Sequence, residues 1–213
     1  MHIAEGVLSL PVLVTGTLLS LGGVAVGLKR LDEEQIPKAA LLSSAFFVVS
    51  TIHLPLGPLS VHMVLNGLLG LILGWVAFPV ILIALLLQTV LFGFGGFTTL
   101  GINTFNLAFP AVLCFYLFSP FVLCKSQRIA FLCGWLVGAF SIGLSVVMLG
   151  FSLLATGREF IHVVQLGLVA YLPVMFLEGL ITASVIVFLR QVRPQLLVPW
   201  STPCLNTQSS SFV

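Results

Sequence analysis

Long apolar stretches, each closed by a turn signal or a charged residue, constrain the fold of this chain more than any other feature. Seven of them follow one another, at about 8–28, 37–54, 60–74, 75–94, 101–124, 128–155 and 161–189. A helix needs about 20 mostly apolar residues to cross the hydrocarbon core of a bilayer, and most of these stretches approach that length. The sequence therefore predicts an all-α membrane protein with seven transmembrane helices.

The composition excludes a soluble domain. Of the 213 residues, 59% are hydrophobic and 7% are charged, and the mean hydropathy is +1.23. Soluble globular domains carry far more charge. The third apolar stretch is short, and we expect a hinge near Gly74 and Trp75 between it and the fourth. Residues 1–193 are predicted to form the membrane domain, and residues 194–213, which contain Pro and Ser, a mobile cytoplasmic tail.

Basic residues predict the orientation. If the chain crosses seven times, seven of its eight Lys and Arg residues fall on one side: Lys29, Arg30, Lys38, Lys125, Arg128, Arg190 and Arg193. Only Arg158 falls on the other side. Basic loops stay in the cytoplasm, which predicts an outside N-terminus and an inside C-terminus. The same alternation places all four histidines, His2, His53, His62 and His162, on the outer side.

The first two residues, Met1 and His2, form a potential metal chelate. No Lys or Arg precedes Lys29, so the start does not resemble a removable signal peptide, and we expect a free amine. The Met1 amine and the His2 amide nitrogen close a five-membered ring on a metal. That amide and Nδ1 of His2 close a six-membered ring. A fourth nitrogen would complete a square-planar set, which suits Ni(II) or Cu(II).

Three histidines compete for the fourth position. His62, in SVHMVLNGLLG, is expected at the start of a transmembrane helix, where the helix start would project it into the protein. An ionisable group at such a place favours a functional role, and histidine is the commonest metal ligand. His53 lies in the Pro-rich turn TIHLPLGP and His162 in the last outer loop, where solvated, capping or interfacial roles are expected. His62 is therefore the predicted fourth ligand.

Three amides are candidates for bracing or lining the metal pocket. Gln88, Asn103 and Asn106 lie in QTVLFGFGGFTTLGINTFN, whose glycines argue against a continuous helix. Irregular backbone at membrane depth is tolerated only where protein buries it or a cavity wets it. These amides could hydrogen-bond the second nitrogen of His62 or the backbone of the N-terminal residues. Linking neighbouring helices is the alternative role.

Other residues have less specific signals. Glu178 lies inside the last stretch, where a carboxylate must be paired or protonated. Glu5 is close to the proposed chelate and could form a salt bridge or a cap. Three G-x-x-x-G pairs favour close packing of helices within the chain, and the small residues of 39–45 could admit a partner helix. The cysteines, Cys114, Cys124, Cys133 and Cys204, have no C-x-x-C spacing and are interpreted as small core residues and a tail thiol.

Four segments carry a resemblance to a known family: MHIAEG, LPLGPLSVHMVLNGLLGLILG, LLLQTVLFGFGGFTTLGINTFNLAFPA and EGLITASVIVFLRQVRPQLL. Together they resemble the CbiM/NikM family, the metal-capturing substrate (S) components of energy-coupling-factor transporters for cobalt and nickel. The resemblance implies a six-helix substrate-component fold with an extra N-terminal helix. It also implies that the N-terminal arm folds back and binds Ni(II) or Co(II) through Met1, His2 and His62.

The resemblance further implies partners in a bacterial or archaeal plasma membrane. These are a transmembrane coupling protein of the EcfT/CbiQ type, two ABC ATPase subunits of the CbiO type and, in some systems, a small accessory subunit of the CbiN/NikN type. The chain contains no G-x-x-x-x-G-K-[ST] phosphate loop, so ATP hydrolysis is expected in those partners and not here. A substrate component for a vitamin-like nutrient is the alternative, and an intramembrane hydrolase is a third class.

Overall fold

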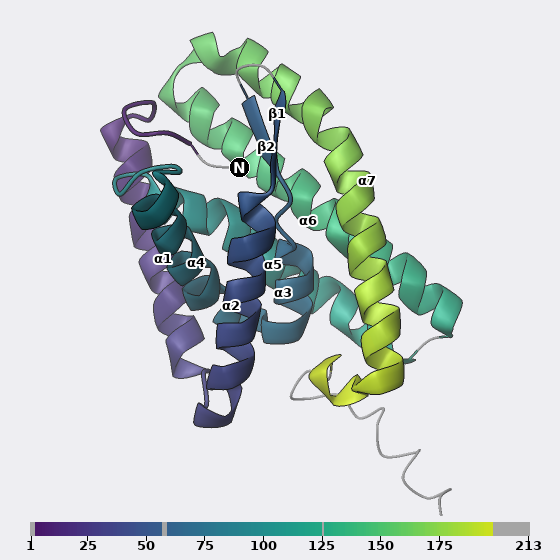
Figure 1. Cartoon of the computed structure of the whole chain (residues 1–213). Helices are drawn as coiled ribbons and strands as arrows, with labels where there is room; N and C mark the ends of the chain where they lie inside the picture. The colour runs from purple at the N-terminus through teal and green to yellow at the C-terminus, as the bar shows by residue number, and fades with distance from the viewer. Residues whose placement is uncertain (1–2, 57–58, 125, 198–213) are drawn as a thin grey trace, which may run out of the picture.

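Seven α-helices, one β-hairpin and four 3-10 segments make up the part of the chain that the computed structural model describes, residues 3–56, 59–124 and 126–197 (Figure 1). In chain order they are α1 (Leu10–Lys29), η1 (Glu33–Gln35), α2 (Ile36–Thr51), β1 (His53–Leu56), β2 (Leu59–His62), α3 (Asn66–Leu73), η2 (Gly74–Val76), α4 (Ala77–Phe92), α5 (Leu100–Cys124), α6 (Gln127–Thr156), η3 (Arg158–Phe160), α7 (Ile161–Val192) and η4 (Pro194–Leu197). The predicted all-α class is confirmed apart from the hairpin.

Within the described residues, five helical segments are long and apolar enough to cross a membrane: Leu10–Lys29, Asn66–Phe92, Leu100–Val122, Gln127–Thr156 and Arg158–Val192. Of the seven predicted stretches, α2 has only 16 residues and α3 only 8. α3 joins α4 through η2 to form one of the five long segments, and Gly74, with φ +56°, lies at the predicted hinge. Together these segments form a multi-pass membrane protein.

A hairpin replaces the predicted start of the third helix. β1 pairs with β2 antiparallel, and His53 is the register partner of His62. The prediction that His62 begins a helix is therefore wrong, because the helix starts four residues later at Asn66. The prolines of the segment explain the change: Pro lacks the N–H that a helix interior needs, whereas a strand pairing satisfies the remaining backbone groups.

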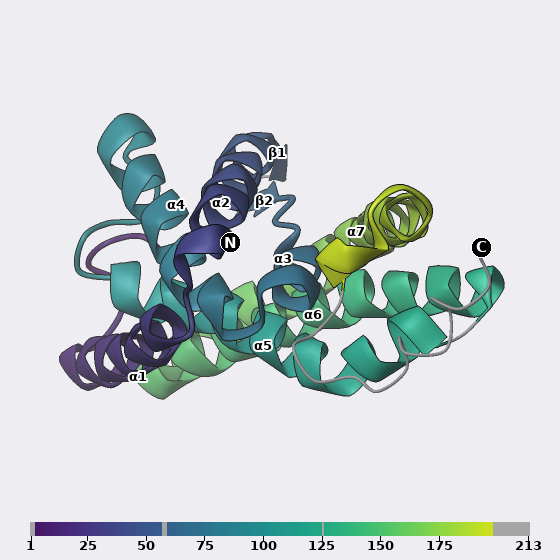
Figure 2. The same cartoon turned by 90° about the horizontal axis from the view of Figure 1, so that it is seen from below.

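Glycines let helices of this chain approach one another closely. A Cβ on Gly134 would meet the backbone of Ala183, and one on Gly138 would meet the backbone of Glu178, both in α7. Gly70 of α3 lies in the same way against the backbone of Ala111 in α5. The G-x-x-x-G glycines thus serve packing within the chain, as predicted. In two views, the start of α6 and the end of α7 lie on the side of the bundle away from α1 and α4, whereas the end of α6 lies near the start of α1 (Figures 1 and 2).

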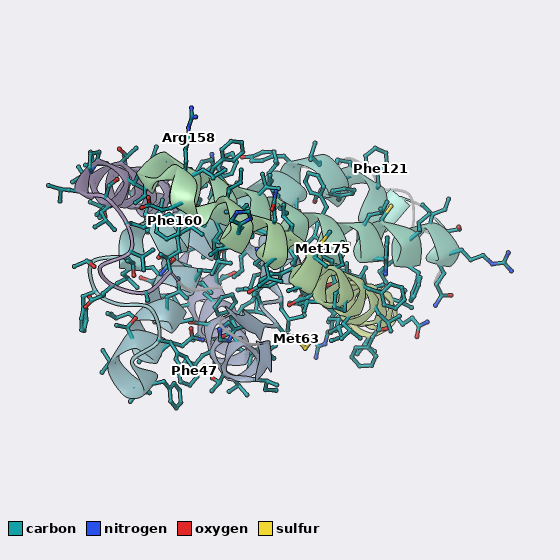
Figure 3. All side chains as sticks on the ribbon, turned by 90° about the horizontal axis from the view of Figure 1, so that it is seen from above. Phe47, Met63, Phe121, Arg158, Phe160 and Met175 are labelled. Atoms are coloured by element: carbon teal, nitrogen blue, oxygen red, sulfur yellow. The ribbon has the colours of Figure 1, made fainter. Side chains whose placement is uncertain are left out.

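The two ends of the bundle differ. The end of α1, the start of α2 and η4 lie at one end, and the hairpin and residues 3–9 lie at the other (Figure 1). At the first end Lys38 Nζ donates to the Leu196 carbonyl at 3.4 Å, and Leu197 is buried. The first four residues of the predicted tail therefore pack against the helices, and residues 198–213 lie outside the described residues. Arg158, in η3, projects away from the molecule (Figure 3).

Candidate metal-binding site

His62 ends strand β2 and is buried, with 2% of its surface exposed. Its ring Nδ1 lies 3.1 Å from the backbone oxygen of Ser50, near the end of α2. A carbonyl oxygen can only accept, so Nδ1 carries the proton and the lone pair of the neutral ring is on Nε2. A hydrogen bond from one ring nitrogen to a carbonyl is the usual way in which proteins fix the nitrogen that binds a metal.

Gln88 braces this contact from α4. Its side-chain nitrogen donates to the Ser50 hydroxyl, and its side chain is fully buried. The amides were predicted to hydrogen-bond the second nitrogen of His62. Gln88 instead holds Ser50, the residue whose carbonyl contacts His62. Ser50 was not singled out in the sequence, because a serine inside an apolar helix has no distinguishing pattern.

Helix α7 supports the backbone that carries His62. The Tyr171 hydroxyl is hydrogen-bonded to the backbone of His62. About two turns further along α7, the Glu178 carboxylate accepts hydrogen bonds from the backbone N–H groups of Val64 and Leu65. The sequence analysis named no partner for Glu178. In the structure its partners are backbone N–H groups between β2 and α3.

Asn103 fixes the N-terminal arm, residues 3–9. Its Oδ1 accepts from the Ile3 N–H at 3.1 Å, and its Nδ2 donates to the Ile3 carbonyl at 3.3 Å and to the Thr99 hydroxyl at 3.3 Å. Ile3, Asn103 and Thr99 are all buried. The amides were predicted to hydrogen-bond either the second nitrogen of His62 or the backbone of the N-terminal residues. Asn103 makes the second of these contacts.

A second contact holds the arm over the α4–α5 loop, residues 93–99. Glu5 Oε1 accepts from the Thr98 N–H at 3.2 Å, and the Glu5 side chain fills the place that a Cβ on Gly96 would need. A salt bridge and a cap were the two predicted roles of Glu5. Its carboxylate accepts a hydrogen bond from a loop N–H, which corresponds to the capping role. Further along the arm, the Ser9 N–H donates to the Thr156 hydroxyl at 3.2 Å.

The same loop also touches His62. The ring of Phe94 packs beside the imidazole, with ring centroids 5.9 Å apart. Phe94 is itself anchored to the end of α4, since its carbonyl accepts from the Thr89 hydroxyl at 3.0 Å. One loop thus contacts the arm through Gly96 and Thr98 and contacts His62 through Phe94. The prediction of irregular, glycine-rich backbone in this stretch is confirmed.

The remaining candidates lie elsewhere. Asn106 donates to the Ser152 hydroxyl at 3.3 Å and so links α5 to α6, which is the alternative role predicted for the amides. His162, in the first turn of α7, is exposed. Cys114 is buried in the core and Cys133 is partly buried, both free. Met1 and His2 lie outside the described residues.

Within residues 3–56, 59–124 and 126–197, the structure has no group of three or more His, Cys, Asp or Glu side chains arranged to hold a metal ion. The predicted ligand set does not depend on such a group, because two of its donors are backbone nitrogens of residues 1 and 2. The set of Met1, His2 and His62 stays a prediction.

Comparison with known families adds the decisive observation. Residues 2–196 match the family CbiM, described as the cobalt uptake substrate-specific transmembrane region. The chain belongs to this family. The match spans every helix of the bundle, and it shows that the chain is a cobalt/nickel-type substrate-specific membrane component, as the resemblance of its motifs predicted.

Relatives carry names that agree with this membership. A putative metal transport protein of Haemophilus influenzae is 43% identical over 202 residues, which cover 92% of this chain and 97% of that protein. The cobalt transport protein CbiM of Sorangium cellulosum is 29% identical and covers 92% and 94%. The putative fused nickel transport protein NikMN of Archaeoglobus fulgidus is 27% identical and covers 95% and 70%. These relatives are named as transport proteins and not as enzymes.

Solved structures share the CbiM fold. A transition metal transporter has a TM-score of 0.73 at 25% identity over 90% of this chain and 93% of the other. A truncated transition metal transporter has a TM-score of 0.70 at 23% identity, covering 90% and 97%. The bundle described above is therefore the architecture of this transporter class.

Proposed function

We propose that this CbiM protein captures Ni(II) or Co(II) for an ATP-driven importer, with the metal held by the Met1 amine, the amide and imidazole of His2, and the imidazole of His62. The observation that carries the proposal is the clamp between Asn103 and Ile3. It fixes the residue that directly follows His2, and the loop that holds the same arm also packs on the ring of His62.

The tautomer of His62 fits this role. Because Nδ1 donates to the Ser50 carbonyl, Nε2 is the nitrogen that would bind the metal. With the three nitrogens of the N-terminal chelate it completes a planar set. Nickel accepts a planar nitrogen set more readily than cobalt does, so nickel is the favoured cargo. The metal is a transported substrate here, not a resident cofactor.

The proposed topology has seven crossings, the N-terminus outside and the C-terminus in the cytoplasm. In this arrangement α2 and the hairpin–α3 segment each count as a crossing, although α2 and α3 are short. Support comes from the seven-to-one distribution of basic residues and from the position of the N-terminal arm at the end of the bundle opposite η4 (Figure 1). The proposed metal site then faces the side from which a nutrient arrives.

The proposed partners are a coupling protein of the EcfT/CbiQ type and ATPase subunits of the CbiO type, because the chain itself has no phosphate loop. An accessory subunit of the CbiN/NikN type is also proposed. Its support is the relative named as a fused NikMN protein, of which the match covers only 70%. The apolar outer surface of the helices suits the membrane in which this assembly would work, and exposed side chains such as Leu10, Leu41 and Phe151 are typical of it.

Equilibrium dialysis of the purified chain tests the proposal. The chain should carry its native N-terminus and an affinity tag only at the C-terminus. We expect saturable binding of a single Ni(II) or Co(II) ion per chain, measured by metal analysis. A chain that binds neither ion, but retains a vitamin-like organic molecule, would support the alternative class instead.

A further inference from the structure

The link from the end of β2 to the start of α3, residues 62–65, carries the proposed ligand His62, and the side chains of Val64 and Leu65 within it are buried in the core. It enters α3 through Leu65, whose backbone is in the left-handed region with φ 54°. A non-glycine residue keeps that conformation only where the surroundings impose it. Two side chains that hold this backbone come from α7.

Two buried polar side chains of α7 contact this link at its two ends. Tyr171 is hydrogen-bonded to the backbone of His62. Glu178 accepts from the N–H groups of Val64 and Leu65, with the Leu65 N–H shared between Oε1 at 2.9 Å and Oε2 at 3.0 Å. Tyr171 is 5% exposed and Glu178 is fully buried.

The spacing of the two residues matches the link. Seven residues of α-helix place Tyr171 and Glu178 on one face, about 10 Å apart along the axis. The three residues from His62 to Leu65 can span up to about 10 Å. α7 thus holds both ends of the link, and successive N–H groups converging on one carboxylate form the kind of anion-binding turn that fixes backbone direction.

Helix α3 holds the other side of the link. Its own position is set by contacts with different helices: Gly70 packs on the Ala111 backbone of α5, and Gly67 packs on Ser141 and the Val137 carbonyl of α6. These contacts hold α3 in place, and the Asn66 side chain at its start donates to the Leu107 carbonyl and the Ser145 hydroxyl. The hydrogen bonds to Glu178 hold the backbone of Val64 and Leu65 just before that point.

We propose that Glu178 is a positioning residue for metal capture: its carboxylate orients His62 through the backbone of Val64 and Leu65, with Tyr171 holding the strand end. This inference rests on the proposed role of His62 as a ligand. It assigns a task in the transport reaction to a carboxylate that would otherwise be only a costly group inside the membrane.

A double-mutant cycle tests the proposal on the full chain with a native N-terminus. Ni(II) affinity is measured for the parent chain, Glu178→Gln, His62→Ala and the double variant. Loss of a group that supports a metal ligand lowers affinity by about 10–100-fold, which is the change expected for Glu178→Gln alone. In the His62→Ala background the N-terminal donors still bind weakly, and Glu178→Gln should then change the affinity little.

Thr182→Val is the matched control. Thr182 is a fully buried polar residue one turn beyond Glu178 on α7, and no hydrogen bond of its hydroxyl is present in the described part of the chain. We expect its replacement to leave Ni(II) affinity unchanged. If Glu178→Gln prevents folding, Tyr171→Phe, which removes only the hydroxyl on the His62 backbone, enters the same cycle with the same expectation.

The outcomes separate the two proposals. If Glu178→Gln weakens binding equally with and without His62, or does not weaken it in the parent chain, the positioning role is overturned. In the case where Glu178→Gln prevents folding, an unchanged affinity of Tyr171→Phe overturns it. If His62→Ala itself leaves the affinity unchanged, the ligand assignment fails, and the positioning role that rests on it fails with it.

Discussion

The side-chain amide of Asn103 pairs with both the N–H and the carbonyl of Ile3, as a neighbouring strand would. The two residues are 100 positions apart, and both are buried. An asparagine amide can donate and accept at once, which no carboxylate or aliphatic residue of similar size can do. The start of the chain is therefore held by one side chain of α5, next to the loop that contacts His62.

Replacing Asn103 should weaken metal binding. Asn103→Ala removes both hydrogen bonds to Ile3 and leaves a buried N–H and a buried carbonyl without their partner. We expect Ni(II) affinity to fall by about 10–100-fold, the usual effect of removing a group that orients a ligand. Isothermal titration of the purified protein measures it.

Asn106→Ala is the matched control for this change. Asn106 lies three residues further along the same helix and is equally buried, but it contacts Ser152 and not the arm. We expect it to lower thermal stability with little change in metal affinity. Equal losses of affinity in the two variants would contradict a specific role for the Asn103 clamp.

Gly96→Ala should loosen the arm from the other side. A methyl group at this position overlaps the side chain of Glu5, which must then leave its place over the loop unless the arm or the loop moves. Because the same loop carries Phe94 against His62, we expect a lower Ni(II) affinity, and the fold should persist because the change is in a connection between helices. Titration and a melting curve measure the two effects.

Gly22→Ala in α1 is the control for the added methyl. A Cβ at Gly22 meets nothing within 4 Å, and alanine favours a helix over glycine. This variant should bind Ni(II) as the parent chain does and melt at the same or a higher temperature. A Gly96→Ala protein with full affinity would show that the Glu5 contact does not position the arm.

His62→Ala should abolish tight metal binding, whereas His53→Ala should largely preserve it. The two residues are register partners in the hairpin, so the pair separates the role of the imidazole from the role of the strand. Removing a direct ligand should cost more than the roughly 10–100-fold typical of a supporting group. If His53→Ala were the damaging change in equilibrium dialysis, the ligand assignment would be wrong.

Several features of the fold could be predicted because their signals are local. The bend at Gly74 and the irregular loop at 93–99 follow from glycines, since a positive φ or an interrupted helix favours that residue. The bracing role of Asn103 was predictable as one of two options, because a buried amide inside a membrane must find partners. Tertiary packing determines that Asn103 pairs with Ile3 and that Asn106 pairs with Ser152.

Other features had no signal in the sequence. The hairpin at 53–62 was missed because its strands have only four residues each, with one proline inside β1 and another between the strands, and their pairing depends on the surrounding helices. The partners of Glu178 and His62 are backbone groups, which are the same for every residue type and so leave no pattern. The carboxylate could be recognised as needing a partner, but the partner could not be named.

The order of metal affinities follows from the proposed nitrogen donors. Along the divalent series, affinity of such a site rises from cobalt to nickel to copper. We expect competition dialysis in vitro to favour Cu(II), then Ni(II), then Co(II), so that selection in the cell rests on metal availability and site geometry. The absorption spectrum of the nickel complex should be that of a planar nitrogen complex. A spectrum typical of an octahedral, water-rich complex would contradict the planar arrangement.

An extension ahead of Met1, or an acyl group left on its amine, should eliminate high-affinity metal binding. An added residue converts the amine into an amide, which removes the first donor of the chelate. It also adds chain ahead of Met1, which in the proposed site lies two residues before the clamped Ile3. The same residues added at the C-terminus, beyond η4 at the opposite end of the bundle, should leave binding unchanged. The measurement is Ni(II) titration of both tagged forms, each verified by mass spectrometry. A chain with an intact N-terminal extension that binds nickel as tightly as the native chain would overturn the proposed mechanism of metal capture.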